Sequence, residues 1–280
     1  MSIALFCGTP ALPHKAILTF LHLFCDTFVM VMSQLTYLCL TIILIHSTKT
    51  AEIQKAVGNA DVFRPHVHKY LVMLHIYESN SRTEGTGDDM ISCSGSIIDK
   101  RWIISAAHCF SGNINKIEII TKTSSKINVL GFAEKYSNHP RFIQNLEFSC
   151  NNYQHDLALV KTRKSIQLSG FIKPIALARF VESGQYGIVA GYGSGIPLEG
   201  VVVVNRCESQ SCDCSYKMLC SKHWAYAEEG DSGGALTTDD GLVGVVSAGA
   251  ATTSIFVDIS LHFDWIQKVT RKKLVNTTST

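Results

Sequence analysis

Three short segments of this 280-residue chain combine residue types that can carry nucleophilic catalysis. Ser232 stands in Gly230–Gly234, where flanking glycines permit a tight turn whose backbone N–H groups can bind a developing negative charge. A serine hydroxyl is a poor nucleophile unless a base takes its proton and an acceptor orients that base. His108 and Asp156 can supply those two groups. The alternative interpretation is a loop serine, a core histidine and a turn cap.

The elements that must position these groups are short apolar runs, rich in isoleucine and valine and bounded by turn residues. Such runs predict the strands of a β-barrel or sandwich. They include residues 70–76, 96–98, 102–104, 117–120, 157–160, 187–190 and 242–246. Ser260–Leu274 carries apolar residues at helical spacing and predicts a terminal helix. The polar stretches 81–92 and 144–154 are predicted to be surface loops.

Composition excludes several classes of function. Hydrophobic residues make up 46% of the chain and charged residues 17%, which is an ordinary globular balance. The net charge of +2 is too small to favour nucleic acid as a partner, and no RNA-binding motif is present. The cysteines at 207, 212 and 214 match no usual zinc spacing, so neither a metal site nor a cofactor is expected.

An apolar leader indicates secretion. Residues 16–45 are mostly apolar, and the strongest part, 38–45, is short for a membrane span but suits the centre of a signal peptide. We therefore expect a signal peptide or signal anchor in residues 1–47, and stable membrane association only if this segment is not cleaved. Ten cysteines in a chain with such a leader favour an oxidising, extracellular location.

Three motifs carry a family resemblance. Ala106-Ala107-His108-Cys109, His155-Asp156-Leu157-Ala158-Leu159 and Gly230-Asp231-Ser232-Gly233-Gly234 resemble those of chymotrypsin-like serine proteases, in that family's order of His, Asp and Ser. The resemblance implies an all-β fold of two packed six-stranded antiparallel β-barrels with a C-terminal helix, over residues 56–280. It also implies a secreted serine endopeptidase acting on polypeptides and open to protein protease inhibitors. A protease homologue that kept the triad but acts as a binding or regulatory module is the alternative.

The resemblance assigns a role to each residue of the motifs. Ser232 is implied as the nucleophile, His108 as the general base and acid, and Asp156 as the group that orients His108. The backbone N–H groups of Gly230 and Ser232 are implied as the oxyanion hole.

The resemblance also implies a zymogen. Lys55-Ala56-Val57-Gly58-Asn59 is similar to the family's activation junction, so residues 48–55 are expected to be a short propeptide. Cleavage after Lys55 would free the Ala56 amine to pair with Asp231. Ala56 replaces the usual isoleucine, and its smaller side chain is expected to fill the insertion pocket less well.

Substrate-binding residues follow from the same resemblance. Ser247 and Gly249 fall where the family pairs with the substrate backbone, and Tyr226 falls six residues before Ser232, where the family reads the main substrate side chain. Trypsin-like enzymes have aspartate there, so specificity for Arg or Lys is not expected. Tyr226 would leave a shallow pocket for small or apolar side chains, or its hydroxyl would contact a polar one.

Two disulfides are implied by the resemblance. Cys93 fits a bridge to Cys109, beside the catalytic histidine, and Cys207 fits a bridge to Cys220, with Cys212 or Cys214 as competing partners. Seven cysteines follow the leader, and these two bridges would use four of them. The three that remain, Cys150 among them, are an odd number, which predicts one free thiol or a bond to another chain.

Overall fold

The computed structural model describes part of the chain. The described residues are 61–62, 68–79, 89–122, 126–143, 154–193, 195, 197–207, 218–222, 227, 230–250 and 253–272. The chain divides into two units, Met1–Gln54 and Lys55–Thr280, and every described residue belongs to the second. The expected signal segment and propeptide lie outside the described residues. Within the part that is described, no helix has the length and apolar character needed to cross a bilayer.

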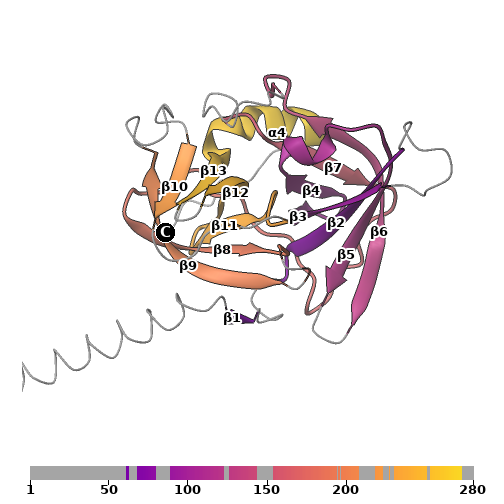
Figure 1. Ribbon diagram of the computed structural model, residues 1–280, viewed down its shortest axis with the longest axis horizontal. Coiled ribbons are helices and arrows are strands. Elements are labelled where there is room, and N and C mark those ends of the chain that lie inside the picture. Colours follow the sequence, from indigo (N-terminus) through magenta and orange to yellow (C-terminus); the bar gives the residue numbers. More distant parts are fainter. Residues whose placement is uncertain are drawn as a thin grey trace, which may run out of the picture. The chain divides into compact units, whose positions relative to one another are not determined.

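Six antiparallel strands close into a first barrel (Figure 1). In order around the barrel they are β2 (Leu71–Glu78), β3 (Asp89–Asp99), β4 (Trp102–Ser105), β7 (Ala158–Thr162), β6 (Ile127–Asn138) and β5 (Ile114–Lys122). The register places Leu74 of β2 opposite Cys93 on one side and Ile119 on the other. All four residues of β4 are buried, because both faces of this part of the wall are covered.

Six further antiparallel strands close into a second barrel. In order they are β8 (Gln185–Gly191), β9 (Leu198–Arg206), β10 (Met218–Lys222), β13 (Thr253–Asp258), β12 (Gly241–Ala250) and β11 (Ala235–Thr238). One edge of β9 is divided between two partners. Its end pairs with β10, and its beginning pairs with the two-residue strand β1 (Asp61–Val62), which places Asp61 opposite Glu199.

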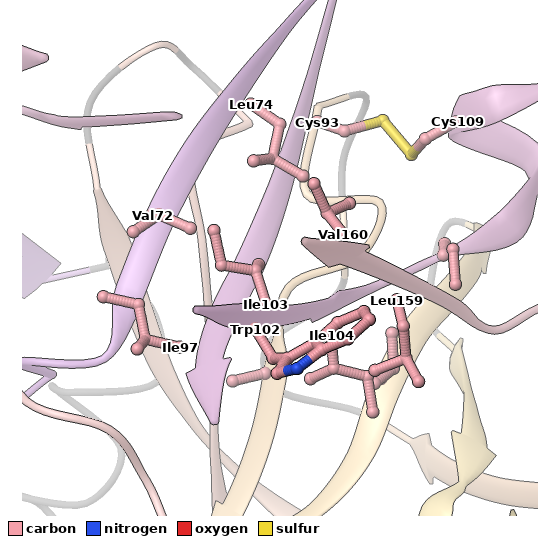
Figure 2. Close-up of a cluster of buried hydrophobic side chains, with 14 of the residues drawn as sticks. Val72, Leu74, Cys93, Ile97, Trp102, Ile103, Ile104, Cys109, Leu159 and Val160 are labelled. Atoms are coloured by element: carbon pink, nitrogen blue, oxygen red, sulfur yellow. A yellow bond between two sulfur atoms is a disulfide. The ribbon is translucent and has the colours of Figure 1, made fainter. Parts of the chain in front are cut away.

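A continuous apolar core joins the two barrels. Figure 2 shows its first part, where Val72 of β2, Ile97 of β3, Ile103 of β4 and Val160 of β7 meet inside the first barrel. Burying a side chain of this size stabilises the fold by about 1.5–3 kcal/mol. The same cluster includes residues of the second barrel and of the C-terminal helix, namely Ala190, Ala235, Leu242, Val245, Val257, Phe263 and Ile266. The sequence-based expectation of two packed six-stranded barrels is confirmed.

The terminal helix is shorter than its apolar pattern predicts. The α-helix α4 spans only Phe263–Thr270, because the preceding residues Ile259–His262 form a separate 3-10 turn, η2. The side chain of Asp258 accepts a hydrogen bond from the backbone of Ser260 and starts that turn. Arg271 takes a left-handed conformation with φ of 56° and ends the helix.

One predicted loop is partly a strand. Asp89–Ser92 belongs to β3 and pairs with the end of β2, so that Ile91 lies opposite Ile76. These residues are exposed or half-buried, which is why their sequence lacks the apolar pattern of a strand. Backbone pairing rather than burial holds them.

Candidate active site

His108 lies in a single 3-10 turn, η1 (Ala107–Phe110), which follows β4. Ala106 and Ala107 are fully buried, and their small side chains let the turn pack against the barrel. A disulfide joins Cys93 of β3 to Cys109 of the turn, across a sequence separation of 16 residues. By restricting the unfolded chain, such a bridge stabilises the fold by on the order of 3 kcal/mol.

The carboxylate of Asp156 is completely buried and accepts three hydrogen bonds. The backbone N–H of His108 donates to Oδ1 at 2.8 Å, His108 Nδ1–H donates to Oδ2 at 2.7 Å, and the Ser247 hydroxyl donates to Oδ2 at 2.6 Å. A buried carboxylate is costly without such donors. Because the bond to Asp156 uses Nδ1–H, the neutral imidazole keeps its lone pair on Nε2.

Two opposing effects act on the pKa of His108. Burial of the ring lowers this pKa, whereas the hydrogen bond and the negative charge of Asp156 raise it by more. The net pKa of His108 therefore lies above its ordinary value of 6.5.

A β-bulge aims Ser247 at Asp156. In the pairing of β12 with β13, Val246 lies opposite Phe256 and Ala248 opposite Ile255, so Ser247 is an extra residue. Such bulges redirect a side chain without ending the strand. The redirected Ser247 hydroxyl carries the third hydrogen bond to Asp156.

Ser232 lies in a tight turn built on two glycines with positive φ. Gly230 has φ of +89° and Gly233 has φ of +81°. A Cβ on Gly233 would come within 2.1 Å of the Ser105 hydroxyl oxygen, so a side chain does not fit there. The N–H of Gly233 donates to the carbonyl of Val246 at 2.8 Å, which fastens the turn to β12 beside the bulge.

Ser94 of β3 connects this turn to both barrels. Its backbone N–H donates to the Ser232 carbonyl at 2.7 Å, and its hydroxyl donates to the Gly230 carbonyl at 3.0 Å. The same hydroxyl oxygen accepts from the backbone N–H of Tyr192 at 2.8 Å, and the Ser94 carbonyl accepts from the Ser105 hydroxyl at 2.7 Å. One residue of the first barrel thus holds the turn that contains Ser232.

Ser232 and His108 are neighbours of the same sulfur atom. The Ser232 carbonyl oxygen and His108 Nε2 each lie 3.9 Å from Cys109 Sγ. Within the described residues, the Ser232 hydroxyl does not hydrogen-bond to His108. The structure therefore joins His108 to Asp156 by hydrogen bonds and brings the Ser232 backbone beside them. Catalytic hydrogen bonds are often loose before substrate binds.

Asp231, the residue before Ser232, points back toward the loop after β8. Its Oδ1 accepts a hydrogen bond from the backbone N–H of Gly193 at 2.7 Å. The carboxylate is half-buried and lies against the segment Gly191-Tyr192-Gly193.

Comparison with known proteins places most of the chain in one family. Residues 58–266 match the model of the protein family described as Trypsin. The chain belongs to the trypsin family. Cathepsin G of Mus musculus is 24% identical over 261 residues, which cover 84% of this chain and 92% of the relative. Granzyme-like protein 2 of Rattus norvegicus is 28% identical over 233 residues, which cover 73% and 86%.

Solved structures agree with the fold. HL collagenase is similar with a TM-score of 0.61 and 22% identity, over 78% of this chain and 100% of the other. Neuropsin from mouse brain, a serine protease, is similar with a TM-score of 0.60 and 22% identity, over 74% and 97%. The chain is a chymotrypsin-like serine protease, because its trypsin-family relatives are serine endopeptidases.

The trypsin-family residues expected to read the substrate are partly described. Ser247 and Gly249 lie on β12, and Gly249 is exposed while Ser247 is buried against Asp156. The expected specificity residue Tyr226 and the expected activation residues Lys55 and Ala56 lie outside the described residues. The second disulfide joins Cys207 to Cys220 and links β10 to the end of β9. Cys150, Cys212 and Cys214 lie outside the described residues.

Sequence reasoning missed a cluster of three histidines. His139, His155 and His262 each offer a ligand atom, and these atoms all lie within 4.8 Å of one another. Burial, and then the neighbouring His262 and His155, lower the pKa of His139 to about 4. Burial also lowers the pKa of His262. The one signal in the sequence is that His155 directly precedes Asp156, which indicates that this histidine lies near the candidate active site.

We predict that Ser94→Ala lowers the free energy of unfolding by about 1–3 kcal/mol, because the backbone groups of Tyr192 and Gly230 lose a buried partner. Urea unfolding followed by tryptophan fluorescence measures the change. Ser96→Ala is the matched control, because Ser96 is buried in the same strand and, among the described residues, its hydroxyl has no hydrogen-bond partner. Equal effects of the two substitutions would show that the Ser94 hydroxyl does not hold the turn.

Proposed function

We propose that this protein is a secreted serine endopeptidase that hydrolyses peptide bonds through Ser232, His108 and Asp156. The observation that carries the proposal is the buried carboxylate of Asp156, which fixes His108 beside the turn that contains Ser232. The two disulfides support secretion, because such bonds persist in oxidising compartments.

The reaction proceeds through an acyl-enzyme. Ser232 Oγ attacks the scissile carbonyl carbon while His108 Nε2 takes the hydroxyl proton. The electron pair of the C=O bond moves to the oxygen, and the backbone N–H groups of Gly230 and Ser232 stabilise the resulting oxyanion. Collapse of this intermediate breaks the C–N bond, and His108 gives its proton to the leaving amine. Water then repeats the sequence and releases the carboxylic acid.

Asp156 acts through His108. Its carboxylate keeps the imidazole in the tautomer with a free lone pair on Nε2 and stabilises the imidazolium that forms when His108 takes the proton. Three donors hold the carboxylate, so it does not rotate away when the ring becomes charged.

The protein is a zymogen activated by cleavage after Lys55. The freed Ala56 amine pairs with Asp231 and thereby orders the oxyanion hole. The position of Asp231, next to Ser232 and bonded to the loop at Gly193, supports this step, because movement of its carboxylate passes to the Gly230–Ser232 backbone. Ala56 fills the insertion pocket less well than isoleucine, which makes activation weaker than is usual for the family.

The main substrate pocket contains Tyr226 in place of the aspartate of trypsin-like enzymes. The pocket accepts small or apolar side chains, or a polar one that meets the tyrosine hydroxyl. The substrate backbone pairs with β12 at Ser247–Gly249 as an added strand.

We expect a fluorophosphonate to label Ser232 only after the chain has been cut after Lys55. Mass spectrometry of the labelled peptide measures the modification, and Ser232→Ala provides the blank. Lys55→Gln blocks the cut at that position and should leave the chain unlabelled.

The labelling separates the protease from its alternative. A chain that is cut after Lys55, remains folded and still takes no label would be a protease homologue acting as a binding or regulatory module. Full labelling of the uncut chain would contradict activation at Lys55 alone.

The rate of acylation should rise with pH through an apparent pKa above 6.5, because the protonated imidazole of His108 cannot act as a base. Stopped-flow acylation by an activated ester, measured from pH 5 to 9, gives this pKa. Asp156→Asn no longer holds His108 in the tautomer with its lone pair on Nε2, so the rate should fall by about 10⁴-fold. A wild-type midpoint at or below 6.5 would argue against His108 as the base.

Cleavage of a randomised peptide library should show no dominant preference for Arg or Lys at the residue before the scissile bond. Tyr226→Asp is the informative variant, because a carboxylate in the pocket should increase cleavage after basic residues. A wild-type profile dominated by Arg and Lys would overturn the proposed role of Tyr226.

A further inference from the structure

A second group of chemically active side chains lies next to the proposed triad. His139 directly follows β6, His155 directly precedes Asp156, and His262 is the last residue of η2. Three segments that are distant in sequence therefore bring one imidazole each to the same place. The backbone holds two of them in register, since the N–H of His139 donates to the Leu157 carbonyl at 2.8 Å.

The three rings are in direct contact. The centroids of His139 and His155 lie 4.7 Å apart with nearly parallel planes, and His262 meets these rings edge-on at 4.9 and 5.3 Å. His139 and His262 are buried, and His155 is half-buried. Three imidazoles in mutual contact place several ring nitrogens close together, and neutral imidazole nitrogen is the commonest protein ligand for metal ions.

We propose that His139, His155 and His262 form a binding site for a divalent transition-metal ion, with Zn²⁺ as the best fit. Imidazole nitrogen suits zinc and its neighbours in the first transition row, whereas Ca²⁺ and Mg²⁺ prefer oxygen ligands. Three histidines complete three of four tetrahedral positions and leave the fourth to water.

The hydrogen bonding of His262 prepares it as a ligand. Its Nε2 lies 3.0 Å from the backbone carbonyl of Gln154, so Nε2 carries the proton and Nδ1 keeps the lone pair. A ligating histidine is usually fixed in this way through its other nitrogen. Gln154 itself precedes His155, so the same short segment supplies one ligand and orients another.

Binding requires small movements of the rings. Zn–N bonds of about 2.0–2.1 Å place two tetrahedral ligand nitrogens about 3.3 Å apart. The ligand atoms now lie within 4.8 Å, so the rings must rotate toward a common centre. His139 must also give up the bond that its Nδ1 accepts from the backbone N–H of Arg141, which at 3.3 Å is already long.

Nearby charges act in both directions. The Arg141 side chain acts on His139 and His262 in the sense that disfavours a cation, while the Asp258 carboxylate acts on His262 in the opposite sense. The site therefore consists of neutral ligands with one positive and one negative side chain nearby. Such a site suits a transition metal that is held by coordination bonds better than a hard cation that is held by charge.

The test uses the full chain freed of metal by a chelator. Titration with Co²⁺, followed by visible absorption, should give the bands of a tetrahedral ion with nitrogen ligands at one equivalent. Competition with Zn²⁺ gives the zinc affinity.

Two variants remove one ligand each, His262→Gln and His155→Asn. Each should weaken zinc binding by more than about 100-fold, which exceeds the usual effect of removing a residue that only hydrogen-bonds to a ligand. His262→Gln still offers an N–H donor to the Gln154 carbonyl. His75→Gln is the matched control, because His75 is a half-buried histidine on β2 outside the cluster, and it should bind as wild type does.

Three results would overturn the proposal. They are wild-type affinity in both cluster variants, an intense near-ultraviolet charge-transfer band that assigns the ion to cysteine thiolates, and no binding below millimolar metal. Thermal unfolding in chelator checks that each variant is folded. If His262→Gln does not fold, the half-buried His155→Asn decides the outcome alone. None of these measurements depends on protease activity.

Discussion

The structure depends on the need to satisfy one buried carboxylate. Asp156 has no contact with water, and a group of this kind is stable only when donors surround it. Its donors come from η1 and from the bulge of β12, so satisfying one side chain requires both barrels to be in place. The same bonds that stabilise the charge set the tautomer of His108. The stability of the fold and the orientation of the His108 ring therefore depend on the same hydrogen bonds.

Much of the architecture was predictable because its signals are local. Short apolar runs bounded by turn residues predicted the strands, and the motifs around His108, Asp156 and Ser232 each occupy a few consecutive residues. The errors have local causes too. The pattern of Ser260–Leu274 predicts one helix because a 3-10 turn and an α-helix have similar periodicities of burial. The sequence of Asp89–Ser92 predicts a loop because backbone pairing, and not burial, holds this part of the strand.

Other parts of the site could not be predicted, because their partners are distant in sequence. Nothing around Ser94 indicates that its hydroxyl bridges Tyr192 and Gly230, which are 98 and 136 residues away. The bulge that turns Ser247 toward Asp156 depends on its register with β13 and not on its own residue type. The histidine cluster is similar, because His139, His155 and His262 lie far apart in the sequence and only the fold brings them together.

The short strand β1 limits how far a new amino terminus can travel. Its pairing with the beginning of β9 anchors the backbone at Asp61, opposite Glu199. Only five peptide units separate Asp61 from Ala56, and even a fully extended chain of that length reaches no more than about 18 Å. An amine released by cleavage after Lys55 would therefore remain within about 18 Å of Asp61. Confinement to this small volume would give the amine a high effective concentration near Asp61, in the millimolar range typical of short flexible linkers.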